Sequence, residues 1–165
     1  MSHVTIRHAT PSDLSAIVEL IHLKAIFDGC PESVEATPAA LEQTLFSGNP
    51  FAFVLLAETE GEIVGMASYH RIYSTFLARS GLWLDDLYLR EDCRGKAIGK
   101  ALMVKLCRIA DEMGAGRIDW TVDLGNDRAI GFYEHLGAKR QTHVQLCRCD
   151  RPAIKHLAHQ NHPPE

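Results

Sequence analysis

The sequence predicts a mixed α/β fold built around one β-sheet. Segments typical of strands alternate with segments typical of helices along most of the chain, an order that packs helices against a single sheet. The chain has 165 residues, of which 46% are hydrophobic, which suits one compact domain. We therefore expect one domain over residues 1–150, followed by a C-terminal tail over residues 151–165.

The N-terminal part is expected to contain an edge strand and two helices. Residues 4–8 alternate in polarity, as a strand does. Thr10 and Pro11 are typical of a helix start, and an apolar stripe continues that helix to about Asp28. A second, shorter helix is expected over residues 37–46.

The middle of the chain is expected to form the centre of the sheet. Residues 51–59 and 63–73 are typical of a hairpin that turns at Glu60 and Gly61. Residues 82–89 are aliphatic and aromatic, without Gly or Pro, and predict the central strand.

The C-terminal part is expected to alternate helices and strands. From Ile98 onward, apolar residues recur at three- and four-residue spacing and so share one helix face. A strand over residues 118–122, a helix over 126–136 and a last strand over 143–149 follow. The tail has the composition for one further short helix.

A short basic turn joins the central strand to the helix that follows it. It reads Arg94-Gly-Lys-Ala-Ile-Gly-Lys100. Unpaired backbone N–H groups and the positive end of the helix dipole meet at such a turn, which therefore suits a pyrophosphate. It is not a P-loop, because Ala101 follows Lys100, and it lacks the third glycine of a dinucleotide fingerprint, because only Gly95 and Gly99 are present.

A second motif, Asn126-Asp-Arg-Ala-Ile-Gly-Phe-Tyr133, opens the later helix. The turn and this motif together resemble two signatures of the GNAT N-acetyltransferase superfamily, Arg-x-x-Gly-x-Gly/Ala and Asn-x-x-Ala-x-x-Phe-Tyr. The central strand, Trp83-Leu-Asp-Asp-Leu-Tyr-Leu89, is similar to that of the diamine (spermidine/spermine) and thialysine acetyltransferase branch. Ala97 stands where the family usually has glycine. Its methyl group is costly if the position needs a positive φ and harmless if it is helical.

The resemblance implies the GNAT fold, in which the central strand and its neighbour splay at a bulge and helices flank both faces of the sheet. It also implies acetyl-CoA as co-substrate, and direct attack by an amine without an acyl-enzyme. The residues that it assigns to acetyl-CoA lie in the central strand, the basic turn and the later helix: Leu87, Tyr88, Leu89, Arg94, Gly95, Lys96, Ala97, Ile98, Gly99, Lys100, Asn126, Ala129 and Tyr133. A backbone N–H at Leu87 would polarise the thioester carbonyl.

The resemblance makes Tyr133 and Asp85 the catalytic candidates. Tyr133 would protonate the leaving thiolate, because a phenol with a pKa of ~10 and a thiol with a pKa of ~8.5 exchange protons readily at short range. An acceptor amine with a pKa of ~10.4 needs about 4.6 kcal/mol to lose its proton at neutral pH, and a surface aspartate with a pKa of ~3.9 is a poor direct base. Asp85 would therefore orient the amine or pass its proton through water; the alternative is that it faces solvent.

The acceptor site is expected to be acidic. The branch binds a cationic amine, and the matching positions here are Phe27, Asp28, Asp85, Asp119, Trp120 and Thr121. Residues 1–70 are predominantly acidic, whereas residues 90–108 are predominantly basic, which fits a cationic acceptor and a polyphosphate co-substrate. Chance clustering on solvated surfaces is the alternative, and it applies also to Asp28 and Asp119 taken singly.

Composition bears on partners and location. A net charge of −4 does not favour nucleic acid as a partner, and neither a signal peptide nor an apolar run long enough to span a membrane is evident. Five cysteines without framework spacing indicate reduced thiols in a cytoplasm. The tail histidines and Cys147-x-Cys149 lack the spacing of a tetrahedral site, so no metal is expected.

We therefore expect a cytoplasmic N-acetyltransferase for a diamine, polyamine or lysine analogue, in a branch whose members are commonly homodimers. Two enzymatic alternatives are acetylation of a protein N-terminus or lysine and acetylation of an aminoglycoside. From another class, the chain could be a non-catalytic acyl-CoA-binding module.

Overall fold

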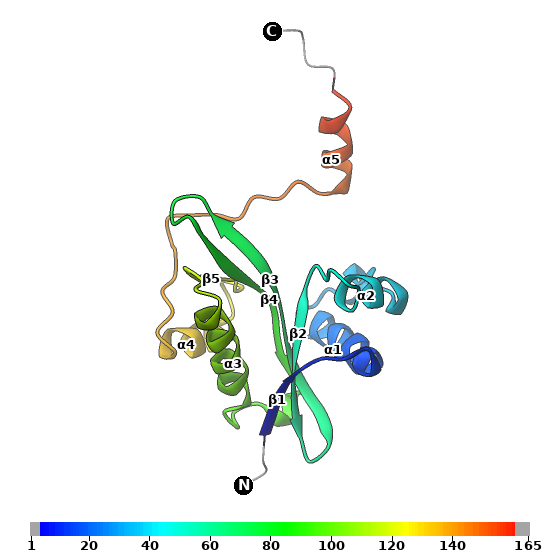
Figure 1. The fold of residues 1–165 in the computed structure, drawn as a ribbon, viewed down its shortest axis with the longest axis vertical. Coiled ribbons are helices and arrows are strands. Elements are labelled where there is room, and N and C mark those ends of the chain that lie inside the picture. Colours follow the sequence, from blue (N-terminus) through cyan, green and yellow to red (C-terminus); the bar gives the residue numbers. More distant parts are fainter. Residues whose placement is uncertain (1–3, 161–165) are drawn as a thin grey trace. The chain divides into compact units, whose positions relative to one another are not determined.

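A computed structural model describes residues 4–160, and its centre is a five-stranded sheet (Figure 1). The strands pair in chain order, and all neighbours are antiparallel except the last two, which are parallel. The strands are β1 (Val4–His8), β2 (Phe53–Thr59), β3 (Glu62–Ser74), β4 (Arg79–Leu89) and β5 (Ile118–Asp119). The predicted mixed sheet is confirmed.

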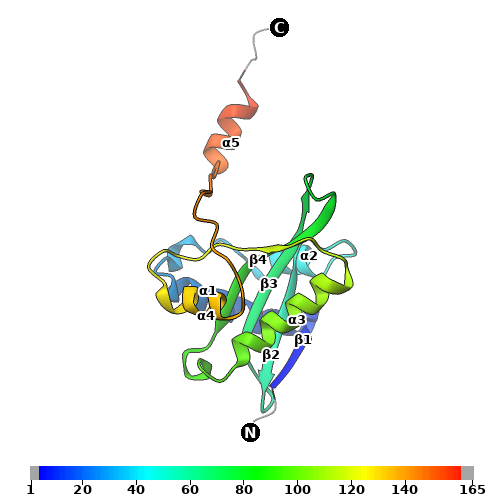
Figure 2. The same ribbon diagram turned by 90° about the vertical axis from the view of Figure 1, so that its left-hand side faces the viewer.

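Helices cover both faces of this sheet, as predicted. Helices α1 (Leu14–Phe27) and α2 (Pro38–Leu45) lie on one face and α3 (Ile98–Glu112) on the other (Figures 1 and 2). Short 3₁₀ turns connect the elements: η1 (Pro11–Asp13), η2 (Pro31–Ser33) and η3 (Glu91–Cys93). The side chains buried between α1 and the sheet are Ile17, Leu20, Val54, Leu56, Met66 and Tyr88.

Polar contacts fix the entry of the chain into α1. Arg7 on β1 donates two hydrogen bonds to the carboxylate of Asp13, at 2.7 and 2.9 Å. The same carboxylate accepts the backbone N–H of Thr10 at 2.8 Å. The Arg7 guanidinium holds the pKa of Asp13 far below its usual range. The first strand is thereby tied to the start of α1.

The chain divides into two compact units, Met1–Asp123 and Leu124–Glu165. The first contains the sheet with α1, α2 and α3. The second contains α4 (Asp127–His135) and α5 (Arg151–Ala158). The domain boundary expected at residue 150 stays a prediction.

Two predictions for the C-terminal strands are wrong. The strand expected over residues 143–149 is absent: that segment is irregular, and Val144 and Leu146 are 59% and 63% exposed. A strand needs a partner to bury its apolar side, and these residues have none in the described part of the chain. The strand expected over residues 118–122 is only two residues long, so Trp120 and Thr121 lie beyond it. The short helix expected in the tail is confirmed as α5, with Asp150 as its N-cap.

Candidate active site

A β-bulge interrupts the pairing of β3 and β4 at Asp85. Tyr69 pairs with Leu84 and Ser68 pairs with Asp86, so Asp85 is the extra residue on β4. A bulge leaves its extra residue unpaired and bends the strand. Asp85 is accordingly exposed, whereas Asp86 is half-buried.

The bulge changes which residues of β4 direct their N–H and C=O groups toward β3 and which direct them toward the opposite edge. Before it, the N–H of Leu82 donates to Arg117 beside β5 at 3.0 Å. After it, the N–H of Asp86 donates to Ser68 Oγ at 3.1 Å and the N–H of Arg90 donates to Val64, both toward β3. Because backbone groups alternate along a strand, those of Leu87 and Leu89 point away from β3.

The edge toward which these groups point has no strand beside it. Strand β5 pairs with β4 only at Leu82 and Trp83, and beyond that point no other described strand adjoins β4 on this side. The predicted splay at a bulge is confirmed. It leaves the backbone groups of Leu87 and Leu89 free of strand pairing, and the N–H and C=O of Leu87 and the N–H of Leu89 are available to a ligand that lies along the edge.

The turn between β4 and α3 is shaped to bind an anion. Gly95 and Ala97 both have left-handed backbones, with φ of +81° and +61°. Such turns direct successive N–H groups into one concavity, and the unpaired N–H groups of the first turn of α3 add to it. Lys96 and Lys100 are exposed and supply positive charge. These residues fit the pyrophosphate of a coenzyme A thioester.

Ala97 has a positive φ, so its methyl group is costly and not harmless at this position. A non-glycine residue at positive φ crowds its Cβ against the backbone. Ala97 adopts this conformation directly before α3 begins at Ile98. The position therefore favours glycine, and the methyl group of alanine is costly there.

Arg94, the first residue of the turn motif, packs against aromatic rings. Its guanidinium carbon lies 4.3 Å from the ring centroid of Phe27 and 5.6 Å from that of Tyr88. Its Nε–H donates to the carbonyl oxygen of Leu89 at 3.2 Å. Arg94 thus ties the turn to the end of α1 and to the open edge of β4.

An acidic cluster forms where the end of α1 meets β4. Lys24 and Asp28 form an ion pair one helical turn apart. The same Lys24 ammonium lies 3.7 Å from Asp86 Oδ1. Ser68 Oγ lies 3.3 Å from the other Asp86 oxygen. Burial, and next the negative charge of Asp85, raises the pKa of Asp86.

This cluster contains two residues that sequence reasoning missed, Asp86 and Lys24. The bulge decides which of two adjacent aspartates faces α1, and no feature of the sequence marks it. Asp28 and its neighbour Phe27 lie where they were expected, at the end of α1. Asp119 instead pairs with Arg117, at 2.7 Å between Oδ2 and Nε.

The second unit carries the remaining predicted residues, on α4. Asn126 is the N-cap, as predicted, and its side-chain oxygen accepts the N–H of Ala129 at 3.0 Å. The rings of Phe132 and Tyr133 lie 5.2 Å apart. Burial raises the pKa of Tyr133 to about 12, so its phenol keeps its proton at neutral pH.

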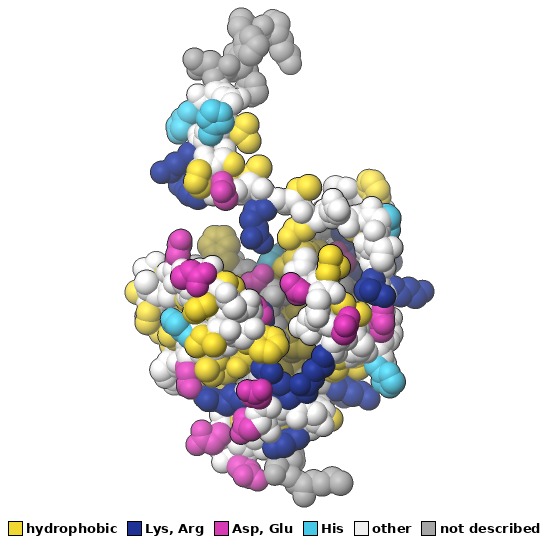
Figure 3. Space-filling model, turned by 180° about the vertical axis from the view of Figure 1, so that it is seen from behind, with side chains coloured by type: hydrophobic (Ala, Val, Ile, Leu, Met, Phe, Trp, Pro, Cys, Tyr) yellow, Lys and Arg dark blue, Asp and Glu magenta, His cyan; other side chains and the backbone are white. Residues whose placement is uncertain are grey.

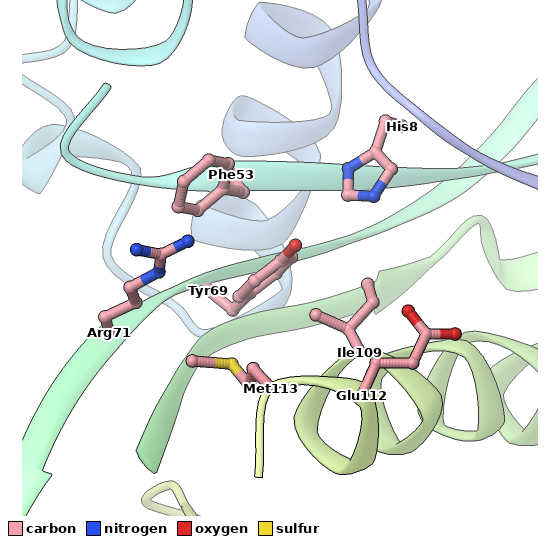
Figure 4. A pocket seen from close by; sticks show the side chains of 7 residues that line it. All are labelled: His8, Phe53, Tyr69, Arg71, Ile109, Glu112 and Met113. Atoms are coloured by element: carbon pink, nitrogen blue, oxygen red, sulfur yellow. The ribbon is translucent and has the colours of Figure 1, made fainter. Parts of the chain in front are cut away.

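A separate, open cavity of about 380 Å³ lies on the α3 face of the sheet (Figure 4). Its floor is formed by Phe53 of β2 and Tyr69 of β3, whose rings stack at 5.4 Å. Arg71 covers the Phe53 ring, and His8 and Met113 complete the rim. None of the residues predicted from the motifs lines this cavity.

The described surface gives little sign of other ligand classes. On the face shown in Figure 3, Lys and Arg side chains gather in a band across its lower part, with a few Asp and Glu side chains among and around them. Among residues 4–160, no group of three or more His, Cys, Asp or Glu side chains is placed to hold a metal. No helix in that range is long and apolar enough to cross a membrane.

The bulge, the open strand edge and the anion-binding turn have the shape and chemistry to suit a coenzyme A thioester. Sequence comparison identifies the family of the chain. Residues 18–138 match the acetyltransferase (GNAT) family. The chain belongs to this family and is an acetyl-transferring enzyme.

Within the family, the chain matches the diamine and thialysine branch. It is 31% identical over 169 residues to thialysine N-epsilon-acetyltransferase of Bos taurus, with 96% of this chain and 99% of the relative covered. It is 28% identical over 195 residues to L-ornithine N5-acetyltransferase NATA1 of Arabidopsis thaliana, with 91% and 86% covered.

Solved structures confirm the fold. An integron cassette protein from the mobile metagenome of V. cholerae superposes with a TM-score of 0.78 at 25% identity, over 95% of this chain and 98% of that one. The aminoglycoside acetyltransferase meta-AAC0020, from an uncultured soil metagenomic sample, gives a TM-score of 0.76 at 20% identity, over 90% and 97%.

Proposed function

We propose that the protein transfers the acetyl group of acetyl-CoA to a primary amine of a small cationic acceptor, of the diamine, polyamine or lysine-analogue class. The observation that carries this proposal is the pair of carboxylates, Asp28 and Asp86, beside the open edge of β4. Carboxylates at such an edge attract an ammonium group toward a thioester held along it. Two of the relatives are named for acceptors of this kind, one for thialysine and the other for L-ornithine.

The turn and the strand edge would hold the co-substrate. The N–H groups between Gly95 and Gly99, with Lys96 and Lys100, would bind its pyrophosphate. The backbone of Leu87 and Leu89 would bind its pantetheine arm, as a strand binds an extended chain. The N–H of Leu87 would donate to the thioester carbonyl oxygen, where negative charge develops during the reaction.

The chemistry we propose is a direct transfer. The acceptor nitrogen forms a C–N bond to the acetyl carbon as the C–S bond breaks. The Tyr133 hydroxyl would donate a proton to the departing sulfur; its raised pKa keeps it protonated at neutral pH and also makes it a weaker acid than an ordinary phenol. Before the attack the acceptor ammonium loses one proton to water, and Asp85 or Asp86 orients the amine. As the amide forms, the nitrogen gives up a second proton, which passes through water to Tyr133 and restores its hydroxyl.

The test is thiol release from acetyl-CoA against putrescine, spermidine, lysine, thialysine, an aminoglycoside and a peptide. We expect turnover with one or more of the small dibasic amines. Turnover confined to the peptide or the aminoglycoside would replace the proposed acceptor class. Acetyl-CoA binding without turnover of any of these amines would overturn the proposed acceptor class and point to an acceptor outside the panel.

Two further expectations belong to the same proposal. The relatives' branch suggests a homodimer, which light scattering of the purified protein would detect. Cysteine usage suggests a cytoplasmic location, and fractionation of the source cells would test it.

A further inference from the structure

Lys24 is a cation inside the acidic site, and the proposed reaction has no use for it. It lies on the last turns of α1, one turn before Asp28, with its side chain 22% exposed. Its ammonium group contacts Asp28 and also lies 3.7 Å from Asp86. An ammonium on the protein thus stands where an acceptor ammonium would be expected.

The surroundings of Lys24 hold its ammonium in place. Asp86 is itself fixed, because its backbone N–H donates to Ser68 Oγ at 3.1 Å and its carboxylate contacts the same hydroxyl. Asp28 is the C-cap residue of the same helix, one turn after Lys24, and pairs with its ammonium group. An ammonium group has three donors, so two carboxylates leave one for another acceptor atom.

The balance of charge in this cluster points to a particular acceptor. Asp28 and Asp86 carry two negative charges and Lys24 one positive charge. A plain diamine brings two ammonium groups and would meet repulsion at Lys24. An α-amino acid with a second amine on its side chain brings an α-ammonium group for one of the carboxylates and a carboxylate for Lys24, and its side-chain amine is left to react.

We propose that Lys24 binds the carboxylate of the acceptor and thereby selects dibasic α-amino acids over diamines and polyamines. The inference rests on the proposed function, since it names the acceptor class of that same site. The α-ammonium group would pair with the carboxylate of Asp28 or Asp86, and the side-chain amine would reach the open edge of β4. Lys24 is a specificity residue in this account and takes no part in proton transfer.

Matched acceptors test this directly. Lysine and cadaverine differ only in the carboxylate, as do ornithine and putrescine. We expect the wild-type protein to show kcat/KM about tenfold or more higher for the amino acid of each pair. Lysine methyl ester, in which the charge of the carboxylate is removed, should behave like cadaverine.

Substitutions at Lys24 test the residue itself. Lys24→Met should lower the lysine-to-cadaverine ratio about tenfold, by losing turnover of lysine and gaining turnover of cadaverine. Lys24→Arg should keep the preference, because it keeps the charge. Lys155→Met, on the exposed surface of α5, is the matched control and should leave both substrates unchanged.

Two outcomes would overturn the inference. One is equal kcat/KM for lysine, its methyl ester and cadaverine in the wild type, a comparison that needs no variant to fold. The other is an unchanged ratio in a folded Lys24→Met protein. Absence of thiol release with every small amine is a different result and would overturn the proposed function instead.

Discussion

The guanidinium carbon of Arg94 lies 4.3 Å from the centroid of the Phe27 ring. Arg94 belongs to the turn that is shaped for a pyrophosphate, and Phe27 is the last residue of α1, next to Asp28 of the acidic cluster. The contact therefore links the anion-binding turn to the acidic cluster through the packing of Arg94 on Phe27.

Replacing the aromatic ring of Phe27 by an aliphatic side chain should loosen the turn that carries Arg94. We expect Phe27→Leu to weaken acetyl-CoA binding about threefold, because a cation–π contact at an exposed site contributes on the order of 0.5–1 kcal/mol. Calorimetric titration of acetyl-CoA measures the change. Phe51→Leu, at a side chain that is 81% exposed, is the control. Equal affinity in both variants would show that Arg94 does not need its aromatic support.

Replacing Ala97 by glycine should stabilise the protein. The left-handed backbone costs an alanine about 1–2 kcal/mol, and the extra freedom of glycine in the unfolded chain returns part of this, so a net gain of about 0.5–1 kcal/mol is expected. Urea denaturation measures the free energy of unfolding. Ala101→Gly, inside α3, should have the opposite effect and cost about 1 kcal/mol. Destabilisation by Ala97→Gly would contradict the strain assigned to this position.

Removing the Tyr133 hydroxyl should slow the chemistry and spare co-substrate binding. We expect Tyr133→Phe to lower kcat about a hundredfold or more, the usual contribution of a positioned proton donor. The dissociation constant for acetyl-CoA should stay within about twofold, since the ring remains. Tyr73→Phe, at a tyrosine that is 66% exposed, provides the comparison. A Tyr133→Phe enzyme with normal kcat would assign proton donation to another group.

The two adjacent aspartates of β4 should differ in importance. Asp86 contacts Lys24, whereas Asp85 is exposed at the bulge. We expect Asp86→Asn to raise the acceptor KM about tenfold and Asp85→Asn to raise it less, because only Asp86 is partly removed from solvent. An effect of Asp85→Asn equal to or greater than that of Asp86→Asn would restore Asp85 as the residue that orients the amine.

The pH profile offers a second test of Asp86. Its pKa is raised, so as pH falls it becomes neutral before an ordinary aspartate does. In its protonated form it no longer attracts a cationic acceptor. We therefore expect kcat/KM to decline on the acid side at a pH above the usual aspartate range, and this decline to vanish in Asp86→Asn.

The raised pKa of Asp86 also affects how the stability of the folded protein depends on pH. The folded state binds this proton more tightly than the unfolded state, so the ionised Asp86 lowers stability above its pKa and Asp86→Asn removes that loss.

The fold could be predicted from the sequence where side-chain periodicity is strong. Helix α3 follows its apolar stripe, and Asn126 caps α4 through a hydrogen bond of 3.0 Å that its residue type suggested. The segment over residues 143–149 shows where this reasoning ends: its alternating apolar residues suggest a strand, but a strand also requires a neighbouring edge.

The candidate site was predictable at the level of motifs and not at the level of contacts. The turn from Arg94 to Lys100 stands out by composition alone. Its left-handed alanine and the packing of Arg94 on Phe27 depend on backbone angles and on a helix far away in the sequence. The partnership of Lys24 with Asp86 depends on the bulge, which changes the face of every residue after it on β4.

The bulge has a consequence for how this strand tolerates change. The backbone of Leu87 points away from β3 because one residue of β4 stays outside the pairing with β3, whatever side chain stands at position 85. A substitution there alters a charge and leaves the strand edge as it is. Deletion of residue 85 would let Asp86 follow Leu84 directly in the pairing with β3, so the N–H of Leu87 would still point away from β3, but the bend that the bulge gives the strand would be lost. The residue at position 85 therefore supplies the bend of the strand by its presence and a negative charge beside Asp86 by its side chain.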